Sequence, residues 1–401
     1  MTTRHRMNAL VVAIGLLLAA SAALSQGIDF PDEPIGNLPG AVKRALFQAQ
    51  GLQKEQRYAE AVDVLAKCLS SDPRNDGRVL RFHLGNALML ADRLDDARQH
   101  YEACVRHDDK SAQGWFQLAR VSYELGDYAR AAQAFAAVNG LLPQRNAQVL
   151  YFTGIAHLMN EKPSPAFEAL SQLVGGAFGP PSLDWCNTFV SAAYAANRIT
   201  ESFPVLRALV EREPGSVGAW RLLYQAGLMA RDYRQAAVAL TVADYVQPID
   251  RKELVELANL YEQIDVPVRA IPYYKRALSS GADGDAAKLH ERIAGAYLSA
   301  RDYDGAIEFL GDVLERAPTP VLWSLLGDVH YKRDEYEQAL NAFGRCVALD
   351  PEEDRALYMM GLCAYELERY DEARQHTLAA ARFERQSEAA DRLLRAIERR
   401  R

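Results

Sequence analysis

The strongest candidate for chemistry in this sequence is a set of three potential metal ligands, His100, Cys104 and His107. Their spacing would place them along one side of a helix, and imidazole and thiolate groups are ligands that Zn²⁺ prefers. However, Cys104 occupies the position that Cys68 and Cys346 hold in equivalent parts of a repeated pattern, which directs it towards a helix interface. We therefore expect Cys104 to be buried, and we assign no metal ion to the set.

Signatures of catalysis are absent from the sequence. It contains no G-x-x-x-x-G-K-[ST] phosphate loop, no H-E-x-x-H motif and no G-x-S-x-G motif. Without a nucleophile, a base and a stabilising group in a recognisable arrangement, the sequence predicts neither an enzyme nor a cofactor or small-molecule substrate. The net charge of −7 and the lack of basic clusters argue against nucleic acid, whose phosphates are bound by grouped Lys and Arg side chains.

The elements that would position any binding residues are pairs of short helices. In the unit VLWSLLGDVHYKRDEYEQALNAFGRCVALDPEED, Trp323 and Gly327 lie on one stripe of a first helix, and Ala339 and Phe343 on one stripe of a second. The small side chains of Gly327 and Ala339 would let the two helix backbones approach closely. Pro351 ends the second helix because proline cannot continue it.

The order of residues in this unit (bulky, Leu-Gly, aromatic, Ala, aromatic, Pro) resembles the tetratricopeptide repeat, whose period is 34. The small residue that opens each second helix recurs at intervals of 33 to 36 residues. It is found at Ala61, Ala97, Ala131, Ala166, Ser202, Ala236, Ala270, Ala306, Ala339 and Ala373. The resemblance implies an all-α fold, a right-handed α-solenoid superhelix of about ten helix-turn-helix repeats with a C-terminal capping helix.

The domain organisation follows from these repeats and from composition. We expect a signal peptide, an extended N-terminal segment containing three prolines, repeats one to four, repeats five to ten and a capping helix. The corresponding ranges are 1–25, 26–40, 41–176, 181–384 and 387–401.

The fifth repeat is the weakest. Ser202 replaces the usual Ala, Pro204 falls inside the expected second helix, and the breaker-rich GGAFGPPS precedes the repeat at residues 175–182. We therefore expect a bend or loosened stacking at this point, and a smaller break at residues 279–285.

The first 25 residues are predicted to be a cleaved signal peptide. Arg4 and Arg6 precede an apolar run at residues 9–23, which ends in small residues of the kind that a signal peptidase recognises. The run has 15 residues, whereas a membrane-spanning helix needs about 20. An uncleaved N-terminal anchor is the alternative. We expect the mature protein to be periplasmic and not an integral membrane protein.

The five cysteines form an odd set without a C-x-x-C pair. We expect them to be small buried hydrophobic residues. A disulfide between Cys346 and Cys363 remains an alternative, because repeats nine and ten would bring their helices together in an oxidising compartment.

The resemblance implies that a protein or peptide partner binds on the concave surface, which the first helices line. In repeats two to four the outward positions are mainly apolar and aromatic, and in later repeats they are more polar. The predicted groove residues are Phe82, Asn86, Met89, Phe116, Arg120, Tyr123, Tyr151, Arg221, Gln225, Asn259, Tyr331, Tyr358 and Tyr365. The alternative is that several of them pack against neighbouring first helices and belong to the core.

Some members of the repeat family hold a C-terminal carboxylate with Lys, Asn and Arg side chains on successive first helices. Asn259, Lys288 and Arg292 match three of these positions. Val255 stands where a Lys is needed, and Glu291 would repel a carboxylate, so the clamp is incomplete.

These features together favour an exported scaffold or adaptor for a complex in a bacterial envelope. Residues 253–281 and 294–307 are similar, more loosely, to exported repeat proteins that accompany TonB-type energy-transducing systems. The alternative function is an assembly factor for an export or outer-membrane machine that handles a polysaccharide, a pilus or a barrel.

Overall fold

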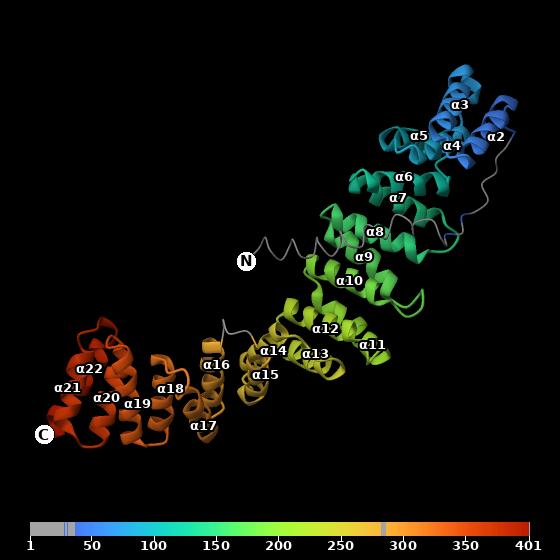
Figure 1. The fold of residues 1–401 in the computed structure, drawn as a ribbon. Coiled ribbons are helices and arrows are strands. Elements are labelled where there is room, and N and C mark those ends of the chain that lie inside the picture. Colours follow the sequence, from blue (N-terminus) through green and yellow to red (C-terminus); the bar gives the residue numbers. More distant parts are fainter. Residues whose placement is uncertain (1–27, 29, 31–36, 282–285, 401) are drawn as a thin grey trace. The chain divides into compact units, whose positions relative to one another are not determined.

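The computed structural model describes residues 28, 30, 37–281 and 286–400 (Figure 1). The regular elements in these ranges are α-helices and two short 3-10 helices. The chain divides into two compact units, residues 1–230 (unit 1) and 231–401 (unit 2). The predicted signal peptide, and most of the predicted extended segment before residue 37, lie outside the described residues.

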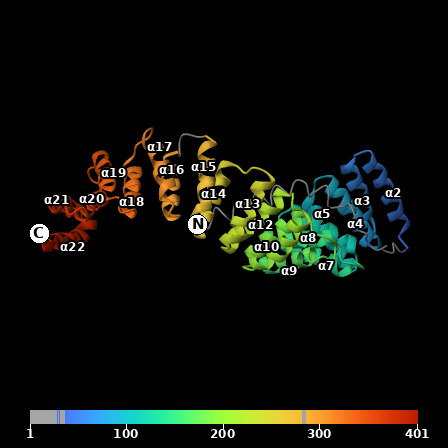
Figure 2. The same cartoon turned by 90° about the horizontal axis from the view of Figure 1, so that it is seen from below.

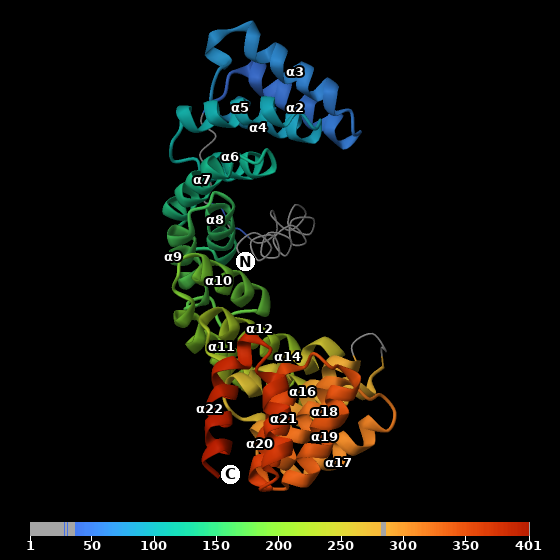
Figure 3. The ribbon, with the colours of Figure 1, turned by 90° about the vertical axis from the view of Figure 1, so that its left-hand side faces the viewer.

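Unit 1 consists of antiparallel helix pairs stacked one after another (Figure 3). Its helices are α2 (Gly40–Lys54), α3 (Tyr58–Ser71), η1 (Pro73–Asn75), α4 (Arg78–Leu90), α5 (Leu94–His107), α6 (Ala112–Glu124), α7 (Tyr128–Leu141), α8 (Ala147–Met159), α9 (Pro163–Val174), α10 (Leu183–Ala195), η2 (Ile199–Ser202), α11 (Phe203–Arg212) and α12 (Val217–Ala230).

Unit 2 continues with the second helix of the sixth repeat and four further pairs (Figure 2). Its helices are α13 (Tyr233–Val246), α14 (Arg251–Gln263), α15 (Pro267–Ser279), α16 (Ala286–Ser299), α17 (Tyr303–Leu314), α18 (Pro320–Lys332), α19 (Tyr336–Leu349), α20 (Asp354–Glu366), α21 (Tyr370–Ala380) and α22 (Glu384–Arg400). The prediction of an all-α solenoid of helix-turn-helix repeats is confirmed.

The small residues that define the repeat are the points of closest helix packing. All ten predicted positions, from Ala61 to Ala373, are 0% exposed, and each is the fourth residue of its helix. One turn further along, a larger side chain packs against a small residue of the first helix. A Cβ added to Gly327 would lie 2.7 Å from the ring of Phe343, and one added to Gly85 would lie 2.6 Å from the ring of Tyr101. The close approach predicted at Gly327 and Ala339 is confirmed.

Each helix pair is joined by a turn that contains one residue with positive φ. That residue always lies five positions before the small residue, and it is glycine only at Gly126. The others have φ between 54° and 61°, and they are Gln56, Asp92, Glu161, Asn197, Arg231, Asp265, Arg301, Asp334 and Glu368. The left-handed conformation costs a non-glycine residue about 1–2 kcal/mol. Hydrogen bonds that close the helix end offset this cost, as where the Arg57 amide donates to the Leu52 carbonyl at 2.9 Å.

Side-chain caps fix where many of the helices begin. The Asn146 side chain accepts hydrogen bonds from two amides of α8, and Asp250 and Glu253 form a capping box at α14. Among the second helices, Asp127 and Asp302 cap α7 and α17 in the same way. These caps satisfy amides that have no partner within their helix.

The fifth repeat differs in detail from the prediction. Its second helix begins as the 3-10 helix η2, which ends at Ser202, and the Ser202 hydroxyl donates to the Ile199 carbonyl at 2.7 Å. Pro204 therefore lies in the first turn of α11 and not in a helix interior. In the first turn a missing N–H leaves no hydrogen bond of the helix unmade. The loop at residues 175–182 lies within unit 1, and α9 and α10 on its two sides pack through Phe167 and Phe189, whose ring centroids are 5.2 Å apart.

The C-terminal helix α22 covers the last repeat, as the capping helix was predicted to do. Leu393 and Ile397 pack with Ala364 of α20 and Ala373 of α21. The end of the solenoid is thereby covered by a helix whose other positions are largely charged.

All five cysteines are buried free thiols, so the prediction that they serve as small core residues is confirmed. Cys346 and Cys363 belong to one core cluster of unit 2. Burial raises the pKa of the Cys346 thiol to about 11 and that of the Cys363 thiol to about 12.

Candidate partner-binding surface

The predicted partner-binding residues of repeats two to four lie on the first helices α4, α6 and α8 of unit 1 (Figure 3). They are named here the first-helix strip and are Phe82, Asn86, Met89, Phe116, Arg120, Tyr123 and Tyr151. Phe116 and Tyr123 are 2% and 8% exposed, and the other five are partly exposed. The apolar members pack on the core of unit 1. Phe116 and Tyr123 therefore belong to the core, as the alternative to the groove prediction stated, and the other five lie at the edge of the core.

Phe116 was predicted to face outwards, and two rings cover it. The ring of Phe135 on α7 lies 6.1 Å away between centroids, and the ring of Phe30 lies 5.3 Å away. Phe135 in turn stacks on Phe152 of α8 at 5.8 Å. Phe116 thus belongs to a row of aromatic rings that runs from the N-terminal segment into the core.

The asparagines of the predicted groove are held by tyrosines of the second helix. The Tyr101 hydroxyl donates to Asn86 Oδ1 at 2.7 Å, and the Tyr274 hydroxyl donates to Asn259 Oδ1 at 2.6 Å in unit 2. Burial raises the pKa of both tyrosines, so their hydroxyls keep the proton that they donate. The amide oxygen of each asparagine is thereby engaged within the chain.

The remaining members of the strip have their own local partners. Arg120 Nε donates to Glu124 Oε1 at 3.2 Å, one helical turn away. The Tyr151 hydroxyl lies 3.3 Å from Thr188 Oγ1 on α10. Tyr123 packs edge-on against Tyr128 at 5.4 Å, and burial raises the pKa of Tyr123 to about 12. The three side chains are therefore oriented before any partner binds.

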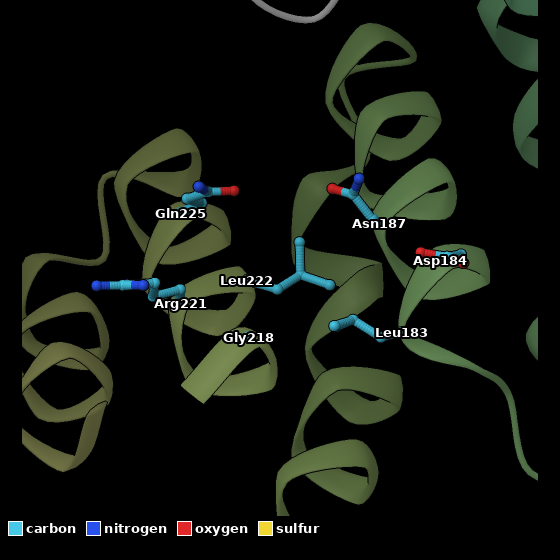
Figure 4. Close-up of a pocket in the computed structure, with 7 residues that line it drawn as sticks. All are labelled: Leu183, Asp184, Asn187, Gly218, Arg221, Leu222 and Gln225. Carbon is cyan, nitrogen blue, oxygen red and sulfur yellow. The ribbon is translucent and has the colours of Figure 1, made fainter. Parts of the chain in front are cut away.

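Beyond the strip, two predicted groove residues line a small open pocket between α10 and α12. Arg221 and Gln225 come from α12, and the pocket has a volume of about 160 Å³. The other lining residues are Leu183, Asp184, Asn187, Gly218 and Leu222. Leu183 and Leu222 face each other at its centre, and Asn187 and Gln225 reach towards the gap from opposite helices (Figure 4). The pocket therefore offers amide groups beside a narrow apolar floor.

In unit 2 the residues that resemble a carboxylate clamp bond to each other. Asn259 Oδ1 accepts hydrogen bonds from both Tyr274 and Arg292, and Glu262 Oε2, 2.9 Å from the Tyr274 hydroxyl, competes for the same hydroxyl hydrogen. Lys288 is exposed on α16, and Val255 on α14 is partly exposed. Arg292 is thus held by Asn259 in the structure described.

The three predicted tyrosines of unit 2 are partly exposed first-helix residues. Tyr331 and Tyr365 each pack edge-on against the tyrosine that begins the next helix, Tyr336 at 5.6 Å and Tyr370 at 5.9 Å. Tyr358 packs on the cluster that α22 covers. The edge-on pair in unit 1 between Tyr123 and Tyr128 repeats the same arrangement.

The three potential metal ligands on α5 have different partners. Cys104 is 0% exposed, His100 Nδ1 lies 3.1 Å from an Arg81 nitrogen, and His107 Nε2 lies 3.0 Å from an Asp76 oxygen. Burial raises the pKa of the Cys104 thiol to about 11. Within the described ranges, no group of three or more His, Cys, Asp or Glu side chains could hold a metal ion.

Comparison with known families identifies the repeats. Models described as "Tetratricopeptide repeat" match residues 82–145, 116–181 and 267–329. A model described as "Anaphase-promoting complex, cyclosome, subunit 3" matches residues 303–380. The chain contains tetratricopeptide repeats. The matched regions include the whole first-helix strip. Of the hydrogen-bonded residues in unit 2, they include Tyr274 and Arg292 but not Asn259.

Several known proteins are similar to this chain over much of its length. The BBSome complex member BBS4 homolog of Drosophila melanogaster is 21% identical over 71% of this chain, and the chain spans about half (53%) of that relative's length. A tetratricopeptide repeat protein from Parabacteroides merdae is 14% identical, with 81% of this chain and 99% of that chain covered and a TM-score of 0.32. YrrB, described as a TPR protein with an unusual peptide-binding site, is 18% identical, with 48% and 97% covered and a TM-score of 0.38.

The tetratricopeptide register locates one residue that the sequence analysis missed. Asn187 of α10 lies 36 residues after Tyr151 and 34 before Arg221, so it occupies the same first-helix position as both. The weak fifth repeat carried no predicted site residue, although its spacing was sufficient to find this one.

None of the helices in the described part of the chain has the length and apolar character needed to cross a membrane.

Proposed function

We propose that this protein is an exported scaffold that binds an extended segment of a partner protein along the first-helix strip of unit 1. The observation that carries the proposal is that three apolar members of the strip are partly exposed. Phe82, Met89 and Tyr151 pack on the core cluster of unit 1 and are not fully buried. Apolar side chains left exposed together on a folded protein usually mark an interaction site.

An extended peptide segment suits the strip better than a compact small-molecule ligand. Each consecutive first helix presents a side chain to the same surface. An extended chain lying across these helices would contact them one after another. The NH₂ group of Asn86 beside Phe82 would donate to a backbone carbonyl of such a segment, while the aromatic side chains would take its apolar residues. The pocket at Asn187 and Gln225 would extend the same pattern with polar contacts.

The proposed context is a multisubunit complex in a bacterial envelope. The similarity to a relative named as a complex member supports a role as one subunit among several. The arginines and the apolar run at residues 4–23 support export. N-terminal sequencing of the protein purified from its own cells tests export directly. A first residue of Gln26 is expected, and a chain that retains residues 9–23 would refute cleavage.

Partner binding is tested with a library of displayed random peptides panned against residues 26–401. Phe82→Asp and Tyr151→Asp place a charge on the strip and should weaken binding of the selected peptides by at least about tenfold. Phe47→Asp is the matched control, because Phe47 on α2 is 81% exposed and lies outside the strip. Equal binding by all three variants, with unchanged helicity, would place the site elsewhere.

A further inference from the structure

Phe30, which lies before α2 in the chain, packs on Phe116 of the first-helix strip. The ring centroid of Phe30 lies 5.3 Å from that of Phe116, with the planes tilted by 59°. Ile28, Phe30 and Leu38 all pack against the core cluster of unit 1. Phe116 is 86 residues away in the sequence, so this contact is not made by neighbouring residues of one repeat.

The burial of Phe116 shows which side of the strip the segment covers. Phe135, which is itself 0% exposed, covers Phe116 from the side of the second helix. Phe116 was predicted to face outwards, and Phe30 is the ring that lies against it from outside its helix pair. The first-helix side chain that a partner would be expected to contact is therefore already covered by a residue of the same chain.

We propose that Ile28 and Phe30 act as an internal ligand, which occupies the first-helix strip until a partner segment displaces it. The inference rests on the proposed function, because it assigns the occupant of the same surface. Ile28 and Phe30 both pack against the core cluster of unit 1. The partner would then carry an aliphatic and an aromatic residue close together in its sequence.

A tethered ligand of this kind lowers the affinity for any competing segment. Because the internal ligand belongs to the same chain, its binding is intramolecular, and even weak internal binding competes strongly with free peptide. Weakening the internal ligand should therefore strengthen binding of a free ligand. A purely structural role of Phe30 would not have this effect.

The test uses a fluorescent synthetic peptide of residues 26–38 and the chain of residues 26–401. Fluorescence anisotropy should show that the Phe30→Ala chain binds the peptide at least about tenfold more tightly than the wild-type chain. Phe47→Ala, the same substitution at an exposed phenylalanine of α2, should bind as the wild type does. A peptide with Ala in place of Phe30 should bind none of the chains. Circular dichroism should show equal helicity, because Phe30 lies outside the described helices.

Two results would overturn the proposal. Equal affinity of the wild-type and Phe30→Ala chains for the peptide would show that Phe30 does not occupy the site. Failure of the Phe30→Ala chain to bind the peptide would show that the strip does not recognise this segment. If peptides selected from the random library still bind at Phe82 and Tyr151, only the internal ligand is refuted. If those peptides also fail to bind there, the proposed function is refuted with it.

Discussion

Substitution of Gly327 by Ala should destabilise unit 2, although the same change stabilises most helices. An added Cβ would lie 2.7 Å from both Cε1 and Cζ of Phe343, whose ring is fully buried. An ordinary carbon contact is about 3.5–4.0 Å, so the ring or the helix must move by about 1 Å. Gly295→Ala is the matched control, because Gly295 lies in the middle of α16 with nothing within 4 Å of an added Cβ.

The magnitude follows from two opposing effects. Replacing Gly by Ala within a helix stabilises it by about 1 kcal/mol, and this gain is common to both variants. Overpacking a well-packed interface costs about 1–3 kcal/mol, and only Gly327→Ala incurs that cost. The difference between the two variants in free energy of unfolding should therefore be about 1–3 kcal/mol.

Urea unfolding followed by circular dichroism measures this difference. Gly295→Ala should raise the free energy of unfolding. The free energy of unfolding of Gly327→Ala should be about 1–3 kcal/mol lower than that of Gly295→Ala. If both variants are stabilised equally, α18 and α19 do not approach each other at Gly327. The account of why a small residue recurs at this position would then be wrong.

Two further predictions concern a helix cap and the buried thiols. Asn146→Ala should lower the free energy of unfolding by about 1 kcal/mol, because Asn146 Oδ1 accepts hydrogen bonds from the Gln148 and Val149 amides. Gln144→Ala, at a neighbouring exposed position, should change the free energy of unfolding little. If the two variants unfold alike in urea, the cap contributes nothing. Burial raises the pKa of the Cys104 thiol to about 11 from 9.0, so the folded chain keeps its proton where the unfolded chain loses it. The free energy of unfolding should therefore fall as the pH rises from 9 to 11. The buried thiols should react with a thiol reagent at pH 8 only after the chain unfolds, and rapid reaction in the folded chain would contradict their burial.

The sequence was sufficient to predict the repeats because their contacts are local. The small residue and the larger side chain four positions later belong to one helix, and their partner lies within the same pair, as Gly327 and Phe343 show. A period of about 34 residues therefore predicts the contacts within each helix pair. The turns within the helix pairs were not predicted, because nine of the ten left-handed residues in these turns are not glycine and only their position distinguishes them.

The candidate site was predicted in register but not in its contacts. Periodicity placed Phe116 on a first helix and towards the partner surface, but it could not find Phe30, because nothing repeats between the N-terminal segment and repeat three. Asn86 and Asn259 were assigned as groove residues without the tyrosines that orient them, Tyr101 and Tyr274. The Phe30 contact has no counterpart elsewhere in the chain, whereas the two Asn–Tyr contacts share a spacing of 15 residues that the repeat pattern could have revealed.

Photo-crosslinking tests the central claim most directly. A peptide selected on residues 26–401, with a benzophenone in place of its aromatic residue, is irradiated in complex with the chain. Mass spectrometry then locates the attachment points. The account predicts attachment to α4, α6 and α8, close to Phe82, Phe116 and Tyr151. Attachment mainly to the second helices α5, α7 and α9, or to unit 2, would contradict it.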